Sequence, residues 1–208
     1  MKCVIFGAGP IADYGFVKRE LPEGGYLLIA ADGGLRHTAA LGLTPDIIIG
    51  DMDSVREEDV PPGAILYPSR KNDTDMMLAV KKGLAVGAEE FFLFGGMGGR
   101  FDHTYANIQT LAYLAEHDAR GWLLDESHRI CILERGELAL SKEYHYLSVF
   151  AYGGVCTGVR ITGAEYELED GVLEPSFPLG VSNQHAPGQQ MRVSVENGSL
   201  LIIQTKLL

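Results

Sequence analysis

The hydrophobic period of the sequence changes once, near residue 125. Before that point, short runs of consecutive apolar residues alternate with segments in which apolar residues recur at helical spacing. Continuous runs are typical of strands buried on both faces, and their alternation with helices indicates βαβ units in a mostly parallel sheet. The expected strands are Cys3–Phe6, Tyr26–Ala31, Ile47–Ile49, Phe91–Phe94 and Trp122–Leu124. The expected helices are Thr74–Val86, with Asp73 or Thr74 as N-cap, and Thr104–Glu116.

After residue 125 the helical spacing disappears, and short apolar runs are separated by turn residues such as Gly153-Gly154 and Asp170-Gly171. The expected strands are Arg129–Leu133, Glu137–Leu140, Tyr146–Ala151, Val155–Ile161, Met191–Val195 and Leu200–Thr205. The pair Asn197-Gly198 between two apolar runs predicts a hairpin. We therefore predict an α/β + all-β chain, with a mostly parallel α/β sheet domain over residues 1–127 and a small antiparallel β-sandwich over residues 128–208.

Charge and composition exclude several classes of function. The net charge is −11, from 28 acidic and 17 basic residues. No run of Lys and Arg exceeds two residues, which argues against a nucleic-acid groove or an anionic membrane surface. No apolar run approaches the roughly 20 residues that span a bilayer. The chain starts directly with a strand-like run, and its three scattered cysteines fit buried free thiols, so we expect a cytoplasmic protein.

Acidic residues gather where the expected strands end. Eleven of the twelve aspartates lie in the first 125 residues, whereas nine of the sixteen glutamates follow them. Ligands bind beyond the carboxyl ends of strands in open parallel sheets, so segments at these ends are expected to meet at one rim. The segments that follow strands are Asp32-Gly33-Gly34, Gly50-Asp51-Met52-Asp53-Ser54 and Gly95 through His103, and a fourth segment, Lys71-Asn72-Asp73-Thr74-Asp75, precedes a helix.

The chemistry of these clusters points to a metal and a phosphate. Several carboxylates on one rim repel each other unless a cation compensates, and Mg²⁺ usually takes one or two carboxylates together with substrate phosphates. Arg100, on a glycine-rich turn, offers a planar fork for phosphate oxygens. Metal-assisted phosphoryl transfer is the class of reaction that this implies.

Each motif alone has a simpler explanation, and one rival function remains open. An isolated Asp-x-Asp-Ser or glycine-rich segment is often only a solvated turn. Gly7-Ala8-Gly9-Pro10-Ile11-Ala12 matches G-x-G-x-x-A, and Asp32 follows at a suitable distance, which favours an NAD(P)-dependent oxidoreductase. That alternative leaves the other aspartates and Arg100 unexplained. A non-catalytic sensor of metal and nucleotide is a third possibility. The histidines other than His103 have no spaced partners and receive no role.

With these motifs in order, the sequence resembles the bacterial thiamine pyrophosphokinase (thiamine diphosphokinase) family over most of its length. The matching segments are Ala31-Asp32-Gly33-Gly34, Pro45-Asp46 leading to Gly50-Asp51-Met52-Asp53-Ser54, Lys71 through Thr74-Asp75, and Gly95-Gly96 through Gly99-Arg100-Phe101-Asp102-His103. Ser182-Asn183 matches part of a Ser-Asn-Glu turn of the family. The resemblance implies an enzyme that transfers diphosphate from ATP to the hydroxyethyl oxygen of thiamine, releases AMP, depends on Mg²⁺ and forms a homodimer.

The resemblance also implies roles for individual residues. Mg²⁺ would be held by Asp51, Asp53 and Asp75, and Arg100 and Asp102 would join them in catalysis. Thiamine would lie near Ser182 and Asn183, across the dimer interface. The expected ATP-binding residues are Asp32, Gly33, Lys71, Asn72, Asp73, Thr74, Gly95, Gly96, Gly99, Arg100 and His103. Asp102 or Asp73 could serve as a general base, and the sequence does not decide between them.

Two positions depart from the family pattern. Asn72 stands where the family usually has a carboxylate, with Asp73 one residue later, which puts the number of metal ions and the role of Asp73 in question. Gln184 stands where the family usually has Glu after Ser-Asn, so the charge is lost and a hydrogen-bonding side chain is kept.

Overall fold

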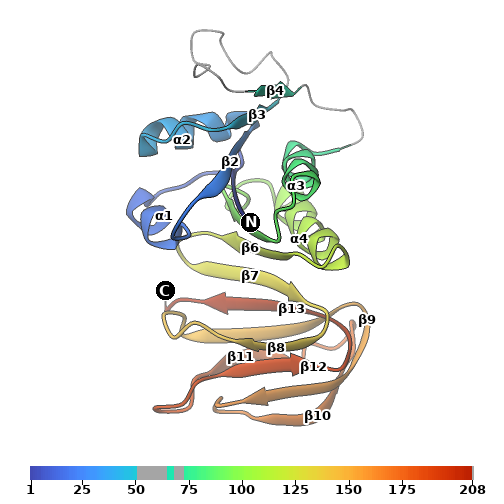
Figure 1. Ribbon diagram of the computed structural model, residues 1–208. Helices are drawn as coiled ribbons and strands as arrows, with labels where there is room; N and C mark the ends of the chain where they lie inside the picture. Colours follow the sequence, from blue (N-terminus) through green and yellow to red (C-terminus); the bar gives the residue numbers. More distant parts are fainter. Residues whose placement is uncertain (51–64, 68–72, 208) are drawn as a thin grey trace. The chain divides into compact units, whose positions relative to one another are not determined.

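The computed structural model describes residues 1–50, 65–67 and 73–207. Of the expected site residues, Asp51, Asp53, Lys71 and Asn72 lie outside these ranges. The described residues form two compact units, Met1–Glu126 and Ser127–Leu208. The chain is of a mixed α/β class, rich in sheet and with few helices (Figure 1). No helix of the described part is long and apolar enough to cross a membrane.

The first unit is built on parallel strands. They are β1 (Lys2–Phe6), β2 (Tyr26–Ala31), β3 (Ile47–Ile49), β4 (Ile65–Tyr67), β5 (Glu90–Phe94) and β6 (Arg120–Leu124). Their order is β4-β3-β2-β1-β5-β6, and every neighbouring pair is parallel. β1 and β5 are in register from Lys2 opposite Glu90 to Phe6 opposite Phe94, so both strands end at the same level.

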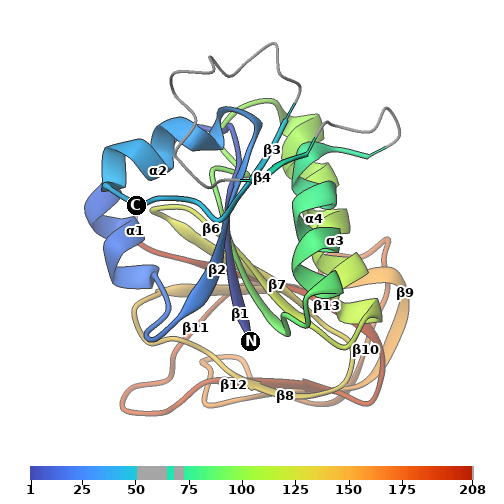
Figure 2. The same cartoon turned by 45° about the horizontal axis from the view of Figure 1, so that its top comes forward.

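Helices cover both faces of these strands. They are α1 (Tyr14–Glu20), α2 (Leu35–Leu41), α3 (Asp75–Ala85) and α4 (Phe101–Glu116), with a 3₁₀ turn, η1, over Asp32–Gly34. Figure 2 shows α1 and α2 on one side of the strands and α3 and α4 on the other. The chain therefore leaves β1 for a helix on one face and β5 for a helix on the opposite face, and these two strands are neighbours in the sheet.

The strongly apolar segments of this unit were predicted correctly. Each of the five expected strands is present, with ends that agree to within two residues. Thr74 is one of the two expected N-caps of α3. It caps the helix, because its hydroxyl oxygen accepts a hydrogen bond from the Met77 amide at 3.1 Å. Helix α4 begins at Phe101, three residues before the expected start, and the 80% exposure of Phe101 explains why the apolar spacing gave no signal there.

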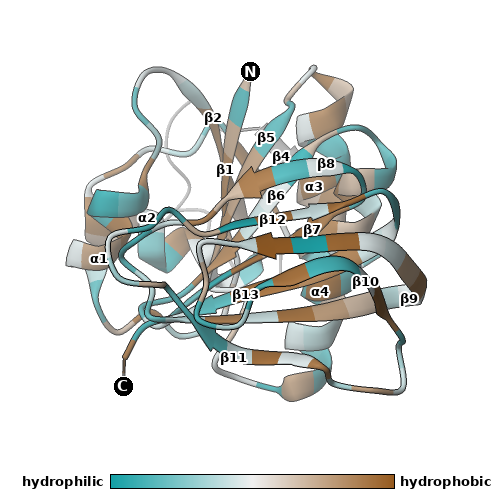
Figure 3. Ribbon diagram, turned by 90° about the horizontal axis from the view of Figure 1, so that it is seen from below, coloured by the Kyte–Doolittle hydropathy of each residue, from teal (hydrophilic) through white to brown (hydrophobic). Residues whose placement is uncertain are grey.

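The second unit is antiparallel throughout. Its strands are β7 (His128–Leu133), β8 (Gly136–Ala139), β9 (Tyr146–Thr162), β10 (Leu168–Leu173), β11 (Gly180–Gln184), β12 (Arg192–Val195) and β13 (Asn197–Thr205). The long strand β9 pairs with β11 and β13 mainly through its first half and with β10 and β12 through its second half. Hydrophilic and hydrophobic segments follow one another along these strands (Figure 3), and buried positions alternate in β13.

Two local expectations for this unit are wrong. The predicted break at Gly153-Gly154 is absent, because Tyr146–Thr162 forms one strand whose pairing with β13 shifts register there; Gly153, with φ of +73°, accommodates the irregularity. Asn197-Gly198 does not close a hairpin between two paired strands. Asn197 and Gly198 are the first two residues of β13, and β13 and the preceding strand β12 both pair with β9. The strands β10 and β11 were not expected from the sequence.

Candidate active site

The carboxyl ends of β1, β2 and β5 open into one cavity of about 720 Å³ in the first unit. Segments from five parts of the chain line it, which are the turns after these three strands and the starts of helices α3 and α4. The lining residues are Gly7, Ala8, Gly9, Pro10, Ala31, Asp32, Asp73, Thr74, Asp75, Met76, Gly95, Gly96, Met97, Gly99, Arg100, Asp102, His103, Thr104, Ala106 and Asn107.

Most of the expected site residues of this unit meet at the cavity. Those that line it are Asp32, Asp73, Thr74, Asp75, Gly95, Gly96, Gly99, Arg100, Asp102 and His103. Gly33 does not line it, but a Cβ atom there would lie 3.2 Å from Cβ of Ala8, which does. Sequence reasoning gave no functional role to Met76, Met97, Thr104, Ala106 or Asn107, because these residue types carry no chemical motif.

Two helices start at the cavity and favour negative charge there. The first turns of α3 and α4 contribute Asp75, Met76, Asp102, His103 and Thr104 to its lining. Free amide groups at a helix N-terminus, together with the helix dipole, attract anions such as phosphate. The turn after β5 is fixed to α4 by the buried Asn107 side chain, which donates to the Gly96 carbonyl at 2.7 Å.

Asp73 is held by a lysine of the helix that follows it. The Lys81 ammonium group lies 2.7 Å from Oδ1 of Asp73, and the two side chains are 39% and 20% exposed. The same ammonium group lies 5.8 Å from the centre of the Tyr113 ring on α4. This pairing occupies one carboxylate oxygen of Asp73 with a contact to Lys81.

Arg100 and Asp102 form a second ion pair at the cavity. Nε of Arg100 lies 3.1 Å from Oδ1 of Asp102, and Nη2 lies 2.5 Å from Oδ2. The hydrogen bonds from Arg100 lower the pKa of Asp102 below its usual range, and the His103 amide, 3.0 Å from Oδ1, lowers it further. Asp102 is therefore ionised at neutral pH and is a weak proton acceptor.

The donor atoms at the cavity suit a hard cation. Asp32, Asp73 and Asp75 bring carboxylate oxygens to its lining, which are the ligands that Mg²⁺ prefers. Within the described residues, however, no three or more His, Cys, Asp or Glu side chains are grouped closely enough to hold a metal ion. Mg²⁺ usually takes only one or two carboxylates besides phosphates and water. The described carboxylates can therefore supply some, but not all, of the ligands of such a site.

The glycine motif after β1 has a structural cause. A Cβ atom on Gly9 would lie 2.5 Å from the Gly95 carbonyl oxygen, and one on Gly7 would lie 2.8 Å from the same atom. Gly95 has a φ of +63°, which favours glycine. The glycines at positions 7 and 9 thus allow two turns to touch, which accounts for the G-x-G spacing without a dinucleotide. The oxidoreductase alternative is therefore not needed to explain these glycines.

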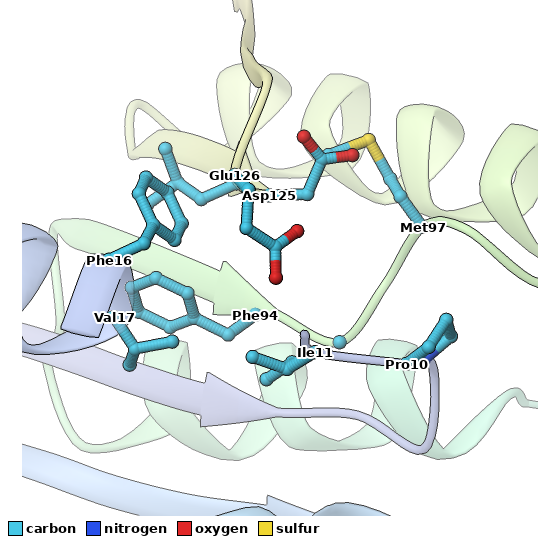
Figure 4. A pocket seen from close by; sticks show the side chains of 10 residues that line it. Pro10, Ile11, Phe16, Val17, Phe94, Met97, Asp125 and Glu126 are labelled. Carbon is cyan, nitrogen blue, oxygen red and sulfur yellow. The ribbon is translucent and has the colours of Figure 1, made fainter. Parts of the chain in front are cut away.

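A smaller hollow beside the cavity is no candidate for a substrate. It measures about 10 Å³, room for one water molecule, and lies between α1 and the ends of β5 and β6 (Figure 4). Phe16, Val17, Phe94 and Ile11 make it largely apolar. Glu126, also at this hollow, accepts hydrogen bonds from the amides of Ala12 and Asp13, at 2.6 and 2.8 Å, and so fixes the start of α1.

Ser182 and Asn183 lie on β11 of the second unit. Asn183 is 7% exposed, and its side chain binds the main chain of Tyr166: Oδ1 accepts from the amide at 3.1 Å, and Nδ2 donates to the carbonyl at 2.7 Å. Its side chain therefore supports the loop at Tyr166. Ser182 is exposed and has a φ of +59°, a strained conformation for serine that is common at functional sites.

A hollow of about 410 Å³ in the same unit is lined in part by Gln184 and His185, but not by Ser182 or Asn183.

Comparisons with known proteins agree on one family. The family model "Thiamin pyrophosphokinase, catalytic domain" matches residues 19–123, and "Thiamin pyrophosphokinase, vitamin B1 binding domain" matches residues 127–200. The chain is 27% identical over 189 residues to thiamine pyrophosphokinase from Bacillus subtilis, covering 86% of this chain and 87% of the relative.

Solved structures are similar over the whole length. The crystal structure of the Bacillus subtilis thiamine pyrophosphokinase aligns with a TM-score of 0.89 and 25% identity, covering 100% of both chains. That of a thiamin pyrophosphokinase from Geobacillus thermodenitrificans aligns with a TM-score of 0.86 and 24% identity, covering 100% of this chain and 98% of the other.

Proposed function

The chain belongs to the thiamin pyrophosphokinase family, and on that premise we propose that it transfers a diphosphate group from ATP to the hydroxyethyl oxygen of thiamine and releases AMP. The observation that carries the proposal is the match of both family domains, in order, to residues 19–123 and 127–200. We assign catalysis to the parallel α/β domain, residues 1–127, and thiamine binding to the antiparallel domain, residues 128–208.

ATP binds, in this proposal, at the cavity where β1, β2 and β5 end. The starts of α3 and α4 attract the phosphates, and the glycines at 95, 96 and 99 let them approach the main chain. Asp32, Thr74 and His103 complete the contacts from the residues that line the cavity, and Gly33, Lys71 and Asn72 are predicted to join them. Arg100 exchanges Asp102 for phosphate oxygens, since its planar fork suits both partners.

Mg²⁺ fits the carboxylates of this site, and we propose Asp75, together with Asp51 and Asp53, as its ligands. When bound, the ion neutralises charge on the phosphates. Asp73 is a less suitable ligand, because Lys81 already takes one of its oxygens.

The proposed reaction depends mainly on the positioning of the two substrates and on the stabilisation of negative charge. The hydroxyl oxygen of thiamine attacks the β-phosphorus in line, the bond to the oxygen that bridges the α- and β-phosphorus breaks, and AMP leaves with that oxygen. The hydroxyl proton passes to water. Arg100 stabilises the charge that develops on the transferred group. Arg100 lowers the pKa of Asp102, which argues against a strong general base at that position, and Lys81 already contacts one carboxylate oxygen of Asp73.

Thiamine is proposed to bind at Ser182 and the loop that Asn183 supports, across a homodimer interface. Large apolar side chains flank this segment and are exposed: Tyr166 is 68% exposed, Phe177 63% and Leu179 55%. Such a surface is suited to a second subunit and to an aromatic substrate. The net charge of −11 favours the approach of the cationic thiazolium ring. The cytoplasmic location expected from the sequence stays a prediction.

Product analysis tests the proposal. Purified protein is incubated with ATP, MgCl₂ and thiamine, and the products are separated by liquid chromatography. We expect AMP and thiamine diphosphate in equal amounts, and none without MgCl₂. ADP with thiamine monophosphate would mean transfer of the γ-phosphoryl group and would contradict the proposed attack. Binding of ATP without turnover would favour the sensor, and binding of NADH would restore the oxidoreductase alternative.

A further inference from the structure

The Gly7–Pro10 turn has no part in the proposed mechanism, yet it lies at a favoured place for a ligand. It follows β1, and the turn that begins at Gly95 follows β5, the next strand in the sheet. The chain continues from β1 and from β5 to helices on opposite faces (Figure 2). Ligands of open α/β sheets bind in the crevice at such a switch point. Gly7, Ala8, Gly9 and Pro10 all line the large cavity there.

The two turns touch through their main chains. The Gly7 amide donates to the Phe94 carbonyl at 2.8 Å, and the Gly9 amide donates to the Gly95 carbonyl at 2.7 Å. The position of the first turn therefore determines that of the turn that leads to Arg100. Ala8 and Pro10 are exposed and carry no charge, so the first turn contributes shape and main-chain groups to the cavity.

A buried histidine holds the first turn from its other side. His37 on α2 is 2% exposed, and its Nε2 lies 2.8 Å from the Gly9 carbonyl oxygen. Because a carbonyl only accepts hydrogen bonds, Nε2 carries the proton, and Nδ1 accepts from the Tyr14 hydroxyl at 2.8 Å. Arg36, the preceding residue, donates to the Ala8 carbonyl.

We propose that His37 is a positioning residue for ATP: by binding the Gly9 carbonyl it fixes the Gly7–Pro10 turn as one wall of the nucleotide cavity. The inference rests on the proposed function, since it takes the cavity to be the ATP site. Gly9 is bound on both sides, by Gly95 through its amide and by His37 through its carbonyl. Loss of His37 leaves one of these two bonds and lets the wall move.

The test separates positioning from stability. His37→Leu removes the hydrogen bond to Gly9, and we expect the dissociation constant for MgATP, measured by calorimetry, and the KM for ATP to rise about tenfold. The KM for thiamine should stay within about twofold, because thiamine is placed in the other unit. His37→Gln keeps an N–H donor near the position of Nε2 and should restore ATP binding to within about threefold of the wild type.

Thr38→Val is the matched control. Thr38 is fully buried on the same helix, and its hydroxyl donates to the Leu35 carbonyl, 2.9 Å away, within α2. This variant should lower the melting temperature and leave ATP binding unchanged. If His37→Leu fails to fold, Tyr14→Phe removes only the hydroxyl that orients His37, and ATP binding should weaken by about threefold.

Three results would overturn the inference. The first is wild-type affinity for MgATP in folded His37→Leu or, if that variant fails to fold, in Tyr14→Phe. The second is an equal rise in the KM for both substrates, and the third is the same loss of ATP binding in Thr38→Val. Failure of the proposed function is a separate outcome. A wild-type protein that makes no thiamine diphosphate but binds MgATP still shows by calorimetry whether His37 positions the nucleotide.

Discussion

Arg100 and Asp102 face each other through two hydrogen bonds, with Nε 3.1 Å from Oδ1 and Nη2 2.5 Å from Oδ2. The carboxylate occupies the same two donors that would bind a phosphate group. The pair is exposed at the cavity, Arg100 to 75% and Asp102 to 61%, so an incoming phosphate can replace the carboxylate without passing through the protein interior. In the proposed function, Asp102 therefore keeps the guanidinium group aligned until a phosphate group binds.

This geometry predicts that lysine cannot replace Arg100. Arg100→Lys keeps the charge but loses the planar fork, so we expect the KM for ATP to rise at least about tenfold and kcat to fall. Steady-state kinetics with varied ATP would measure both. Arg19→Lys is a matched control, because Arg19 is an exposed arginine paired with Asp13 at 3.5 Å on α1, and it should leave both constants unchanged. Normal kinetics of Arg100→Lys would contradict the phosphate role.

Asp53 is predicted to be a metal ligand, although it lies outside the described residues. Asp53→Asn replaces a charged ligand by a neutral one, and we expect kcat to fall by at least about a hundredfold while the melting temperature is unchanged. Asp170→Asn is the control for removing a carboxylate. Asp170 lies in β10 with a φ of +49°, a left-handed conformation that asparagine adopts as readily as aspartate. Near-normal activity of Asp53→Asn at limiting MgCl₂ would refute the assignment.

Substitution of Asp73 should lower kcat less than the loss of a general base would. Since Lys81 binds its carboxylate at 2.7 Å, we expect Asp73→Asn to lower kcat by less than about tenfold and to leave the pH profile of kcat in place. Removal of a general base typically costs about a hundredfold or more. A loss of that size, together with disappearance of the acidic limb of the profile, would identify Asp73 as the base.

Substitutions of the neighbouring residues Asn183 and Ser182 should have different effects on stability. Asn183→Ala leaves the buried main-chain groups of Tyr166 without the partners at 3.1 and 2.7 Å, so we expect the free energy of unfolding to fall by roughly 2–4 kcal/mol. The KM for thiamine should also rise in this variant. Ser182→Ala should raise the KM for thiamine without loss of stability, as measured by urea unfolding. Equal stability of the two variants would contradict the supporting role of Asn183.

Local signals in the sequence were sufficient for much of the first unit. Buried strands such as Tyr26–Ala31 are continuous apolar runs, and Thr74 caps α3 through a bond to a residue three positions away. The aspartate and glycine segments that follow these strands line one cavity because parallel strands share a carboxyl edge. By contrast, α1 and α2 have seven residues each and too few turns to give a clear periodic pattern.

Contacts between distant residues could not be predicted. The glycines at 7 and 9 match a dinucleotide fingerprint, but they are required by contact with Gly95, almost 90 residues further along the chain. His37 received no role because its partners, Gly9 and Tyr14, are close only in the folded chain. The course of β9 through Gly153-Gly154 likewise depends on its pairing with β13, whereas the two glycines alone indicate a turn.

Protonation of His37 should link stability to pH. Burial lowers the pKa of His37 below its usual value of 6.5; the hydrogen bond to the Gly9 carbonyl opposes this shift, and the positive charge of Arg36 adds to it. The unfolded chain therefore binds a proton near pH 6.5 that the folded chain takes up only at lower pH. It follows that the contribution of His37 to the free energy of unfolding is fully present above pH 6.5 and is lost as the pH drops below it.

The contribution of His37 to this slope cannot exceed that of one proton, about 1.4 kcal/mol per pH unit. His37→Gln does not titrate, so the difference in unfolding free energy between the wild type and this variant should change between pH 7.5 and 5 in favour of the variant. Urea unfolding at several pH values would measure it. A difference independent of pH would mean that His37 titrates alike in the folded and unfolded chain.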